Sequence, residues 1–217
     1  MNAFTRQEIT AITPKRRARR WVPGSAVTAG IQYSPVYDAA SGQVAAYQAV
    51  THKTAEHSLS DQIELHIENS PPGKPLLLAL DLQLLLNEEH ATDNAVLQTL
   101  QQHLWSEVEL IACLQHAPDD AWRCMEVCKR LQKAGIPTMV NAHARWDLSS
   151  LHVLVDANTL EFSATQLPAC VEQLLALARE MGIRTLLTEV KSRAQAAWAA
   201  KLGFDWLLGP MSAERMY

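Results

Sequence analysis

The residues of this chain that could do chemistry are spread thinly, and few stand at the spacings of a catalytic or metal site. Cys124 and Cys128 lie four residues apart, near Cys113 and His116, so thiolate and imidazole groups that could bind zinc are present. Structural zinc is usually held by cysteine pairs in loops, whereas 119–134 has a helical pattern, so we expect these cysteines to pack in the core. The sequence contains no H-E-x-x-H or G-x-S-x-G motif, and therefore gives no support for a zinc protease or a serine hydrolase.

Basic residues are concentrated near the start of the chain. Residues 1–24 hold six Lys or Arg and one Glu, whereas the remainder holds 13 basic and 22 acidic residues. An acidic body with a basic arm is not typical of a bulk nucleic-acid binder, but such an arm could contact phosphate, an acidic protein surface or anionic lipid. We expect 1–27 to form a disordered arm, with these candidate contacts to an anion or a partner: Lys15, Arg16, Arg17, Arg19, Arg20 and Trp21.

Length and composition predict a single soluble domain. The chain has 217 residues, of which 48% are hydrophobic and 19% charged, which is ordinary for a globular protein with a sizeable core. No apolar run approaches the ~20 residues of a membrane helix. The basic run is not followed by the apolar stretch of a signal peptide, and the four cysteines are too scattered for a disulfide scaffold. These features predict a cytoplasmic protein.

Strand-like and helix-like segments alternate along the chain from about residue 28, the pattern of an α/β domain. Three successive helix–Gly–strand units favour a βα barrel or an open doubly wound sheet, and periodicity alone leaves both open. No glycine-rich phosphate loop follows a strand, which counts against a nucleotide-binding open sheet. We expect strands at 30–37, 43–51, 75–82, 107–113, 136–141, 151–155, 158–163, 183–189 and 204–208, and helices at about 60–69, 119–134, 166–181 and 192–202.

The six tryptophans fall into two groups by their position in these elements. We expect Trp122, Trp146, Trp198 and Trp206 to pack in the core. Trp21, beside the basic run, and Trp105, near a helix end, are candidates for an interface, where tryptophan is enriched.

The hairpin at 32–50, QYSPVYDAASGQVAAYQAV, resembles the opening of the bacterial EAL domain family, which reads roughly Y-Q-P-I-V-D…T-G…G-Y-E-A-L. The resemblance continues through about 29–217, with Leu131, Gly135, Ser149, Ser150 and Leu151 as framing residues. It implies an α/β fold, a TIM-like (β/α) barrel in one domain at 28–217. Since 50–74 has room for one helix where the family usually has more, we expect a pruned barrel.

The same resemblance implies that the catalytic carboxylates have been replaced. Family members are cyclic di-GMP phosphodiesterases, in which metal-activated water attacks a phosphodiester and several carboxylates hold the cations. Gln48 stands where the motif glutamate binds metal, and a neutral amide is a poorer ligand than a carboxylate for a hard cation. The vestigial pocket positions are Gln48, Asp81, Ala112, Asn141 (or Ala142, depending on a one-residue gap), Glu161 in place of the catalytic lysine, Ser163 in place of an aspartate, and the retained Glu189.

These replacements predict a degenerate EAL-like domain with no phosphodiesterase activity, no metal and no cofactor. We expect it to work as a regulator through protein–protein interaction, with a partner such as a transcriptional or motility regulator. The alternative is a receptor that binds cyclic di-GMP or another nucleotide without hydrolysing it, for which Arg145, Arg184, Arg193 and Lys191 could bind phosphate although Glu161 would oppose it. A role with nucleic acid, through the basic arm alone, is a third reading.

Overall fold

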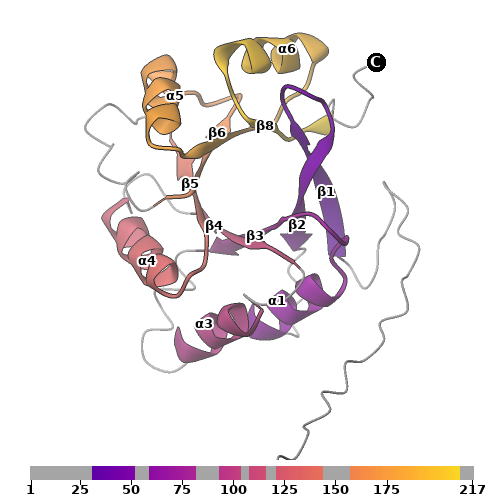
Figure 1. The fold of residues 1–217 in the computed structure, drawn as a ribbon, viewed down its shortest axis with the longest axis vertical. Coiled ribbons are helices and arrows are strands. Elements are labelled where there is room, and N and C mark those ends of the chain that lie inside the picture. Colours follow the sequence, from indigo (N-terminus) through magenta and orange to yellow (C-terminus); the bar gives the residue numbers. More distant parts are fainter. Residues whose placement is uncertain are drawn as a thin grey trace, which may run out of the picture.

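A closed barrel of eight strands forms the centre of the molecule (Figure 1). The computed structural model describes residues 31–51, 59–81, 93–103, 108–115, 121–143 and 157–210. Neighbouring strands in the barrel follow the order of the sequence, from β1 to β8, and β8 pairs with β1 to close it. Sequence periodicity left a barrel and an open sheet as alternatives, and closure decides between them. The α/β barrel implied by the EAL resemblance is confirmed.

One strand runs against all the others. β1 pairs antiparallel with β2, and also with β8 through Tyr37 opposite Leu207 and Asp38 opposite Trp206. Every other neighbouring pair is parallel. The strands are β1 Ile31–Asp38, β2 Val44–Thr51, β3 Leu76–Asp81, β4 Leu110–Gln115, β5 Thr138–Ala142, β6 Thr159–Ser163, β7 Arg184–Thr188 and β8 Trp206–Leu207.

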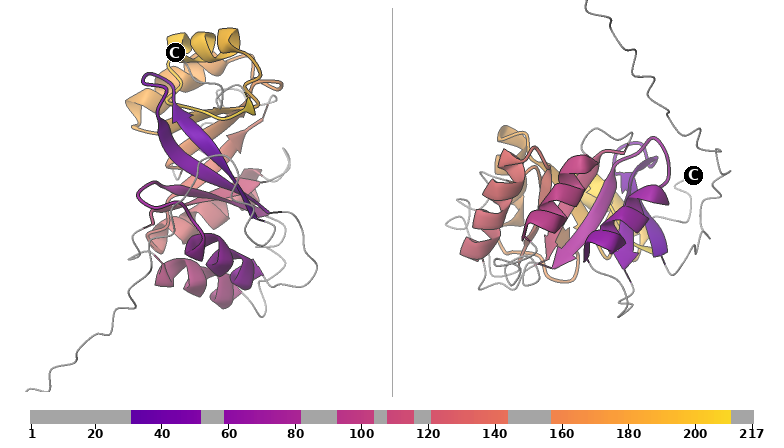
Figure 2. Two further views of the ribbon diagram at one scale, coloured as in Figure 1. Left: turned by 90° about the vertical axis from the view of Figure 1, so that its right-hand side faces the viewer. Right: turned by 90° about the horizontal axis from the view of Figure 1, so that it is seen from below.

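The described helices lie outside the ring of strands. They are α1 Leu59–Glu68, α3 Asp93–Gln102, α4 Ala121–Lys133, α5 Val171–Glu180 and α6 Arg193–Leu202. Helices α1 and α3 lie side by side next to β3, α4 lies near β4 and β5, and α5 and α6 follow around the ring (Figure 1). The two views of Figure 2 show the β1–β2 hairpin forming one wall of the barrel, with helices around the other walls. None of the described helices is long and apolar enough to cross a membrane.

Alternation along the strands divides the core into two parts, because successive side chains of a strand point to opposite faces. One cluster fills the barrel: Val36, Ala46, Leu77, Ile111, Cys113, Met139, Leu186 and Trp206. The larger cluster lies between the strands and the helices and contains Leu76, Leu78, Ala112, Val140 and Phe162 together with the inner faces of the helices. Cys124 and Cys128 of α4 are fully buried in that outer cluster, so the prediction that they pack in the core is confirmed.

The structure adds one helix and shifts several boundaries. Helix α3 was not predicted, and β4 extends two residues beyond the expected 107–113. Helix α5 begins five residues later than expected, at Val171, and Cys170 is its N-cap residue. Among the tryptophans, Trp206 is buried as predicted, but the prediction for Trp198 is wrong: 41% of its surface is exposed on α6. The expected strand 151–155, together with Trp105, Trp146 and the 1–27 arm, lies outside the described residues.

The two ends of the barrel can be identified from strand direction. Because β2 to β8 are parallel, their carboxyl ends meet at one end, which we call the mouth. Antiparallel β1 starts at that same end, since Ile31 is opposite Thr51 at the end of β2. Beyond the strands at the mouth, the Val190 amide donates to the Leu208 carbonyl at 3.1 Å, which extends the contact between β7 and β8.

We expect Gly209→Ala to destabilise the protein, because a Cβ at Gly209 would lie 2.2 Å from the Val190 carbonyl oxygen and 2.6 Å from its nitrogen. Both atoms belong to the backbone, so relief requires the β7 and β8 extensions to move apart. Overpacking of this kind costs about 1–3 kcal/mol of unfolding free energy, measured by urea denaturation. Gly182→Ala is the matched control. Its φ of 69° is unfavourable for alanine, but no atom lies within 4 Å of the added Cβ, so this variant should lose about 1 kcal/mol of unfolding free energy. A G209A variant as stable as the wild type would show that the two extensions are not in fixed contact.

Candidate functional site

An open cavity of about 540 Å³ lies at the mouth of the barrel. Its walls come from the carboxyl ends of β2, β5, β6, β7 and β8 and from the residues that follow them. In a βα barrel this is the end at which substrates bind, because the loops after the strands surround it. The lining residues are Gln48, Asn141, Glu161, Ser163, Thr165, Gln166, Thr188, Glu189, Leu208 and Gly209.

Glu189, the residue after β7, is held by hydroxyl groups from the end of β6. Its Oε2 accepts a hydrogen bond from the Ser163 hydroxyl and another from the Thr165 hydroxyl, the latter at 2.5 Å. These two hydrogen bonds stabilise the ionised carboxylate and lower the pKa of Glu189, although the side chain is exposed. The backbone of Glu189 has a φ of 59°, in the left-handed region that residues other than glycine rarely adopt. Such conformations concentrate at functional sites, so Glu189 is the best-marked residue of the mouth.

Glu161, in the middle of β6, lies deeper in the same cavity and is half-buried. Burial raises the pKa of Glu161, the Thr188 hydroxyl opposes that rise, and the negative charge of Glu189 adds to it. The Glu161 charge in turn contributes to raising the pKa of the buried Cys113 thiol below it, for which burial is the larger cause. The mouth therefore presents two carboxylates, one readily ionised and one that resists ionisation.

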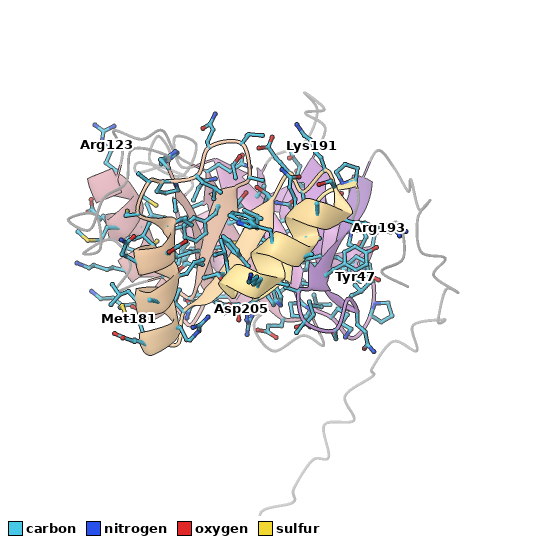
Figure 3. All side chains as sticks on the ribbon, turned by 90° about the horizontal axis from the view of Figure 1, so that it is seen from above. Tyr47, Arg123, Met181, Lys191, Arg193 and Asp205 are labelled. Carbon is cyan, nitrogen blue, oxygen red and sulfur yellow. The ribbon has the colours of Figure 1, made fainter. Side chains whose placement is uncertain are left out.

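The described residues place little positive charge around these two groups. Among the described residues that line the mouth cavity, none is Lys or Arg. Lys191, two residues after Glu189, is the nearby cation, and its attraction is the weakest of the effects on the pKa of Glu189. Figure 3 shows Lys191 at this end of the molecule. The described side chains of the mouth suit the recognition of a cation or of hydrogen-bonding groups.

Five of the seven predicted pocket positions come together at the mouth: Gln48, Asn141, Glu161, Ser163 and Glu189. The position left open between Asn141 and Ala142 is resolved, since Asn141 lines the cavity while Ala142 is buried in the outer cluster. Asp81 is the last residue of β3, opposite Gln115, but its side chain lies outside the described part. The basic arm with its candidate contacts, Lys15 to Trp21, also lies outside it.

Ala112 is the predicted position that the structure places elsewhere. It is fully buried between the barrel and the helices, whereas its neighbours Ile111 and Cys113 point into the barrel. A shift of one residue along a strand moves a side chain to the other face, so a small error in matching β4 to the family pattern has this result. Ala112 does not contribute to the mouth.

Sequence reasoning missed Thr165 and Thr188. Thr165 lies two residues after Ser163, and its hydroxyl contacts both Ser163 and Glu189. Thr188 ends β7 next to Glu189, and its hydroxyl donates to the Phe162 carbonyl at 3.2 Å. Both threonines could have been found from the sequence, because each lies within two residues of a predicted site residue at the carboxyl end of a strand. Residues at the carboxyl ends of parallel strands meet at one end of the barrel.

The side chains at the mouth do not fit the divalent metal that the EAL resemblance implies. Among the described residues, no group of three or more His, Cys, Asp or Glu is placed to hold a metal ion. The described lining of the mouth offers the Glu161 and Glu189 carboxylates together with three amides, from Gln48, Asn141 and Gln166. Hard cations favour several carboxylate ligands, and Glu161 is the carboxylate whose ionised form is disfavoured.

A second cavity, of about 430 Å³, lies at the opposite end of the barrel. Arg184 lies on the face of the Trp206 ring, with its guanidinium carbon 4.3 Å from the ring centroid. Asp205 accepts hydrogen bonds from the amide and the hydroxyl of Thr185, both at 2.8 Å. Figure 3 shows Asp205 and Lys191 at opposite ends of the molecule. Arg184, one of the residues considered for phosphate binding at the mouth, is therefore at the wrong end.

Comparison with known proteins identifies the fold. No family model matches the sequence, and no curated protein matches it. Solved structures of EAL domains do match in three dimensions. The Bacillus subtilis YkuI protein, which has an EAL domain and was solved in complex with c-di-GMP and calcium, aligns with a TM-score of 0.62 at 15% identity over 85% of this chain. This chain spans 54% of the YkuI chain, about half its length.

Two further structures match over most of their own length. The PaMucR phosphodiesterase in complex with c-di-GMP has a TM-score of 0.60 at 17% identity, covering 85% of this chain and 91% of that one. A standalone EAL protein from Vibrio cholerae O395, in its c-di-GMP-bound form, has a TM-score of 0.56 at 13% identity, covering 82% and 88%. At these identities the likeness defines the fold class: the chain has the TIM-like barrel of EAL domains.

We expect Glu161→Gln to change how stability depends on pH. Because burial raises the pKa of Glu161 in the folded state, the folded protein keeps this proton to higher pH than the unfolded chain. Wild-type stability therefore falls as the pH rises from the ordinary carboxyl range through the raised pKa, and E161Q removes that fall. Urea denaturation should find E161Q more stable than the wild type at about pH 7.5, with a smaller difference at about pH 4.

Glu172→Gln, on the exposed face of α5, is the matched control for this measurement. It should leave the difference from the wild type nearly constant across the same pH range. A constant difference for E161Q as well would mean that Glu161 ionises in the folded state as freely as it does in the unfolded chain.

Proposed function

We propose that this protein is a catalytically inactive EAL-like domain that regulates a signalling process in the cytoplasm by binding another protein. The observation that carries the proposal is the composition of the mouth. Gln48, Asn141 and Ser163 stand at positions where the EAL resemblance implies metal-binding or catalytic acids, and Glu161 stands in place of a lysine. Among the described residues, the mouth therefore has neither a suitable metal donor set nor a cation for phosphate.

Electrostatics count against hydrolysis at this site. A phosphodiester is an anion, and the transition state of its hydrolysis gathers further negative charge that metal ions or Lys and Arg must stabilise. The mouth instead places the ionised Glu189 beside Glu161. Several EAL proteins of similar fold were solved with c-di-GMP, one of them together with calcium and another together with manganese. The described lining of the cavity in this chain supplies two carboxylates and neither Lys nor Arg for that chemistry.

A surface for a protein partner is available on α6. Trp198 is 41% exposed on this helix, and its ring centroid lies 6.5 Å from that of the buried Phe204. A partly exposed tryptophan is the kind of side chain that contributes most to affinity at protein interfaces. Met181, 43% exposed at the end of α5, is the other large exposed apolar residue of the described part.

The alternative function is a receptor that binds cyclic di-GMP without cleaving it. The observation in its favour is the cavity itself, about 540 Å³ and open, at the end of the barrel where such folds bind ligands. Purine stacking and hydrogen bonds to Gln48 and Asn141 would then have to offset the repulsion between the phosphates and the two carboxylates.

We expect the purified protein neither to hydrolyse nor to bind cyclic di-GMP. Incubation with Mg²⁺ or Mn²⁺ should produce no linear product above a protein-free blank, and calorimetric titration with either metal should give no heat of binding. An active phosphodiesterase run in parallel is the positive control for the nucleotide and the buffers. Binding without hydrolysis would favour the receptor, and hydrolysis that is lost on Glu189→Gln would contradict the proposal.

Replacing Trp198 with alanine should weaken the complex with the partner. The partner is first identified by affinity capture with the wild type and mass spectrometry, and its affinity is then measured with purified components. We expect W198A to reduce affinity by a factor of about 30, the effect of losing an interface residue worth about 2 kcal/mol. Met181→Ala is the control for loss of an exposed apolar side chain. If the wild type captures no protein at stoichiometric yield, or if W198A binds as well as M181A, the α6 surface is not the interface.

A further inference from the structure

The mouth of the barrel is suited to a cation. Its described lining contains two carboxylates, Glu161 and Glu189, and neither Lys nor Arg. The remaining lining is mostly amides and hydroxyls, among them Gln48, Asn141 and Thr188, which can complete the hydrogen bonding of a guanidinium or ammonium group. A cationic group placed here would find opposite charge and acceptors in a concave site.

The chain enters the barrel at the rim of this cavity. Since β1 is antiparallel to its neighbours, Ile31 lies opposite Thr51, at the carboxyl end of β2. Glu189 follows the carboxyl end of β7 and therefore lies at the same end. The residues that precede Ile31 are thus attached to the body at the mouth and not at the opposite end.

The nearest strongly basic segment is within reach of the mouth. Lys15–Arg20 contains five cations in six residues, and ten residues separate Arg20 from Ile31. Ten residues span at most about 35 Å. Eight strands about 4.8 Å apart and tilted by about 36° make a barrel roughly 15 Å across, so the tether is long enough to reach any side of the mouth.

Charge complementarity favours this segment as the occupant. Residues 1–24 hold six cations and one acid, whereas the remainder of the chain has an excess of nine acids over cations. Arginine pairs with carboxylates through two parallel hydrogen bonds, which gives such contacts geometric specificity. Single exposed ion pairs are weak, but a tether raises the effective concentration of the segment to the millimolar range.

We propose that Lys15–Arg20 binds in the mouth of its own barrel and pairs with Glu161 and Glu189. The bound segment fills the mouth, and a partner that binds the arm must first withdraw it. Lys191, at the rim, carries the same sign of charge as the arm and limits how closely the arm approaches Glu189. The inference does not depend on the proposed function, because it concerns the occupant of the mouth and not the identity of a partner.

Trypsin can test the proposal on the full-length chain, since it cleaves after Lys and Arg and needs an accessible segment. The rate of cleavage within 15–20 is followed by intact mass spectrometry over short times. At about 50 mM salt we expect the wild type to be cleaved about fivefold more slowly than Glu161→Gln/Glu189→Gln. At about 0.5 M salt, where exposed charge pairs are screened, the two rates should become equal.

The matched control is Glu172→Gln/Glu180→Gln, which removes two exposed carboxylates from α5 without touching the mouth. It should be cleaved at the wild-type rate, and circular dichroism should find all three proteins equally folded. If the control is cleaved as fast as the mouth variant, overall charge and not the mouth protects the arm, and the proposal fails. The proposal also fails if, at low salt, the wild type is cleaved as fast as Glu161→Gln/Glu189→Gln.

Measuring protection from trypsin at several protein concentrations distinguishes an arm bound in its own barrel from an arm bound in the barrel of a second copy. An intramolecular contact protects equally at all concentrations, as the proposal requires. Protection that increases with concentration would assign the arm to the mouth of a second copy and would overturn the proposal.

Discussion

Closure of the barrel through an antiparallel first strand is the constraint on which the other features depend. β1 pairs with β8 through only two register positions, Tyr37 with Leu207 and Asp38 with Trp206, yet this contact removes both free edges of the sheet. Once the ring is closed, the alternation of each strand is fixed. One set of side chains fills the barrel and the other packs under the helices. The inward-facing residues above the barrel core, Gln48, Asn141 and Glu161 among them, therefore meet at one mouth.

The fold could be predicted largely from local pattern, and the resemblance to EAL domains supplied the closure. Helices α4 and α6 were predictable because apolar residues recur at helical spacing and a glycine ends each one, with Gly203 in the left-handed conformation. Helix α3 was missed because its apolar face is narrow, and Val96 and Leu100 are its buried residues of that type. Trp198 was assigned to the core by residue type, whereas its exposure depends on how α6 lies on the barrel.

The candidate site was predictable in position and less so in detail. Strand ends identified five lining residues, because register at the mouth follows directly from the parallel pairing. The Ala112 position shows the weakness of the method: a pattern match cannot distinguish the two faces of a strand when the residues on both are apolar. The hydroxyl network of Ser163 and Thr165 around Glu189, and the left-handed backbone of Glu189, depend on three-dimensional contacts between β6 and β7 that no spacing encodes.

The direction of β1 also has a practical consequence for engineering this molecule. Because β1 begins, and β8 ends, at the mouth, the residues before Ile31 and after Leu207 are attached to the same end of the barrel. A fluorescent protein joined directly before Ile31 or directly after Leu207 would therefore be attached at the mouth and would crowd it. The β1–β2 turn at 39–43 lies at the other end, where the amide of Gly42 is bonded to the Asp38 carbonyl at 2.9 Å. A short label inserted in that turn would report on the protein while leaving the mouth open.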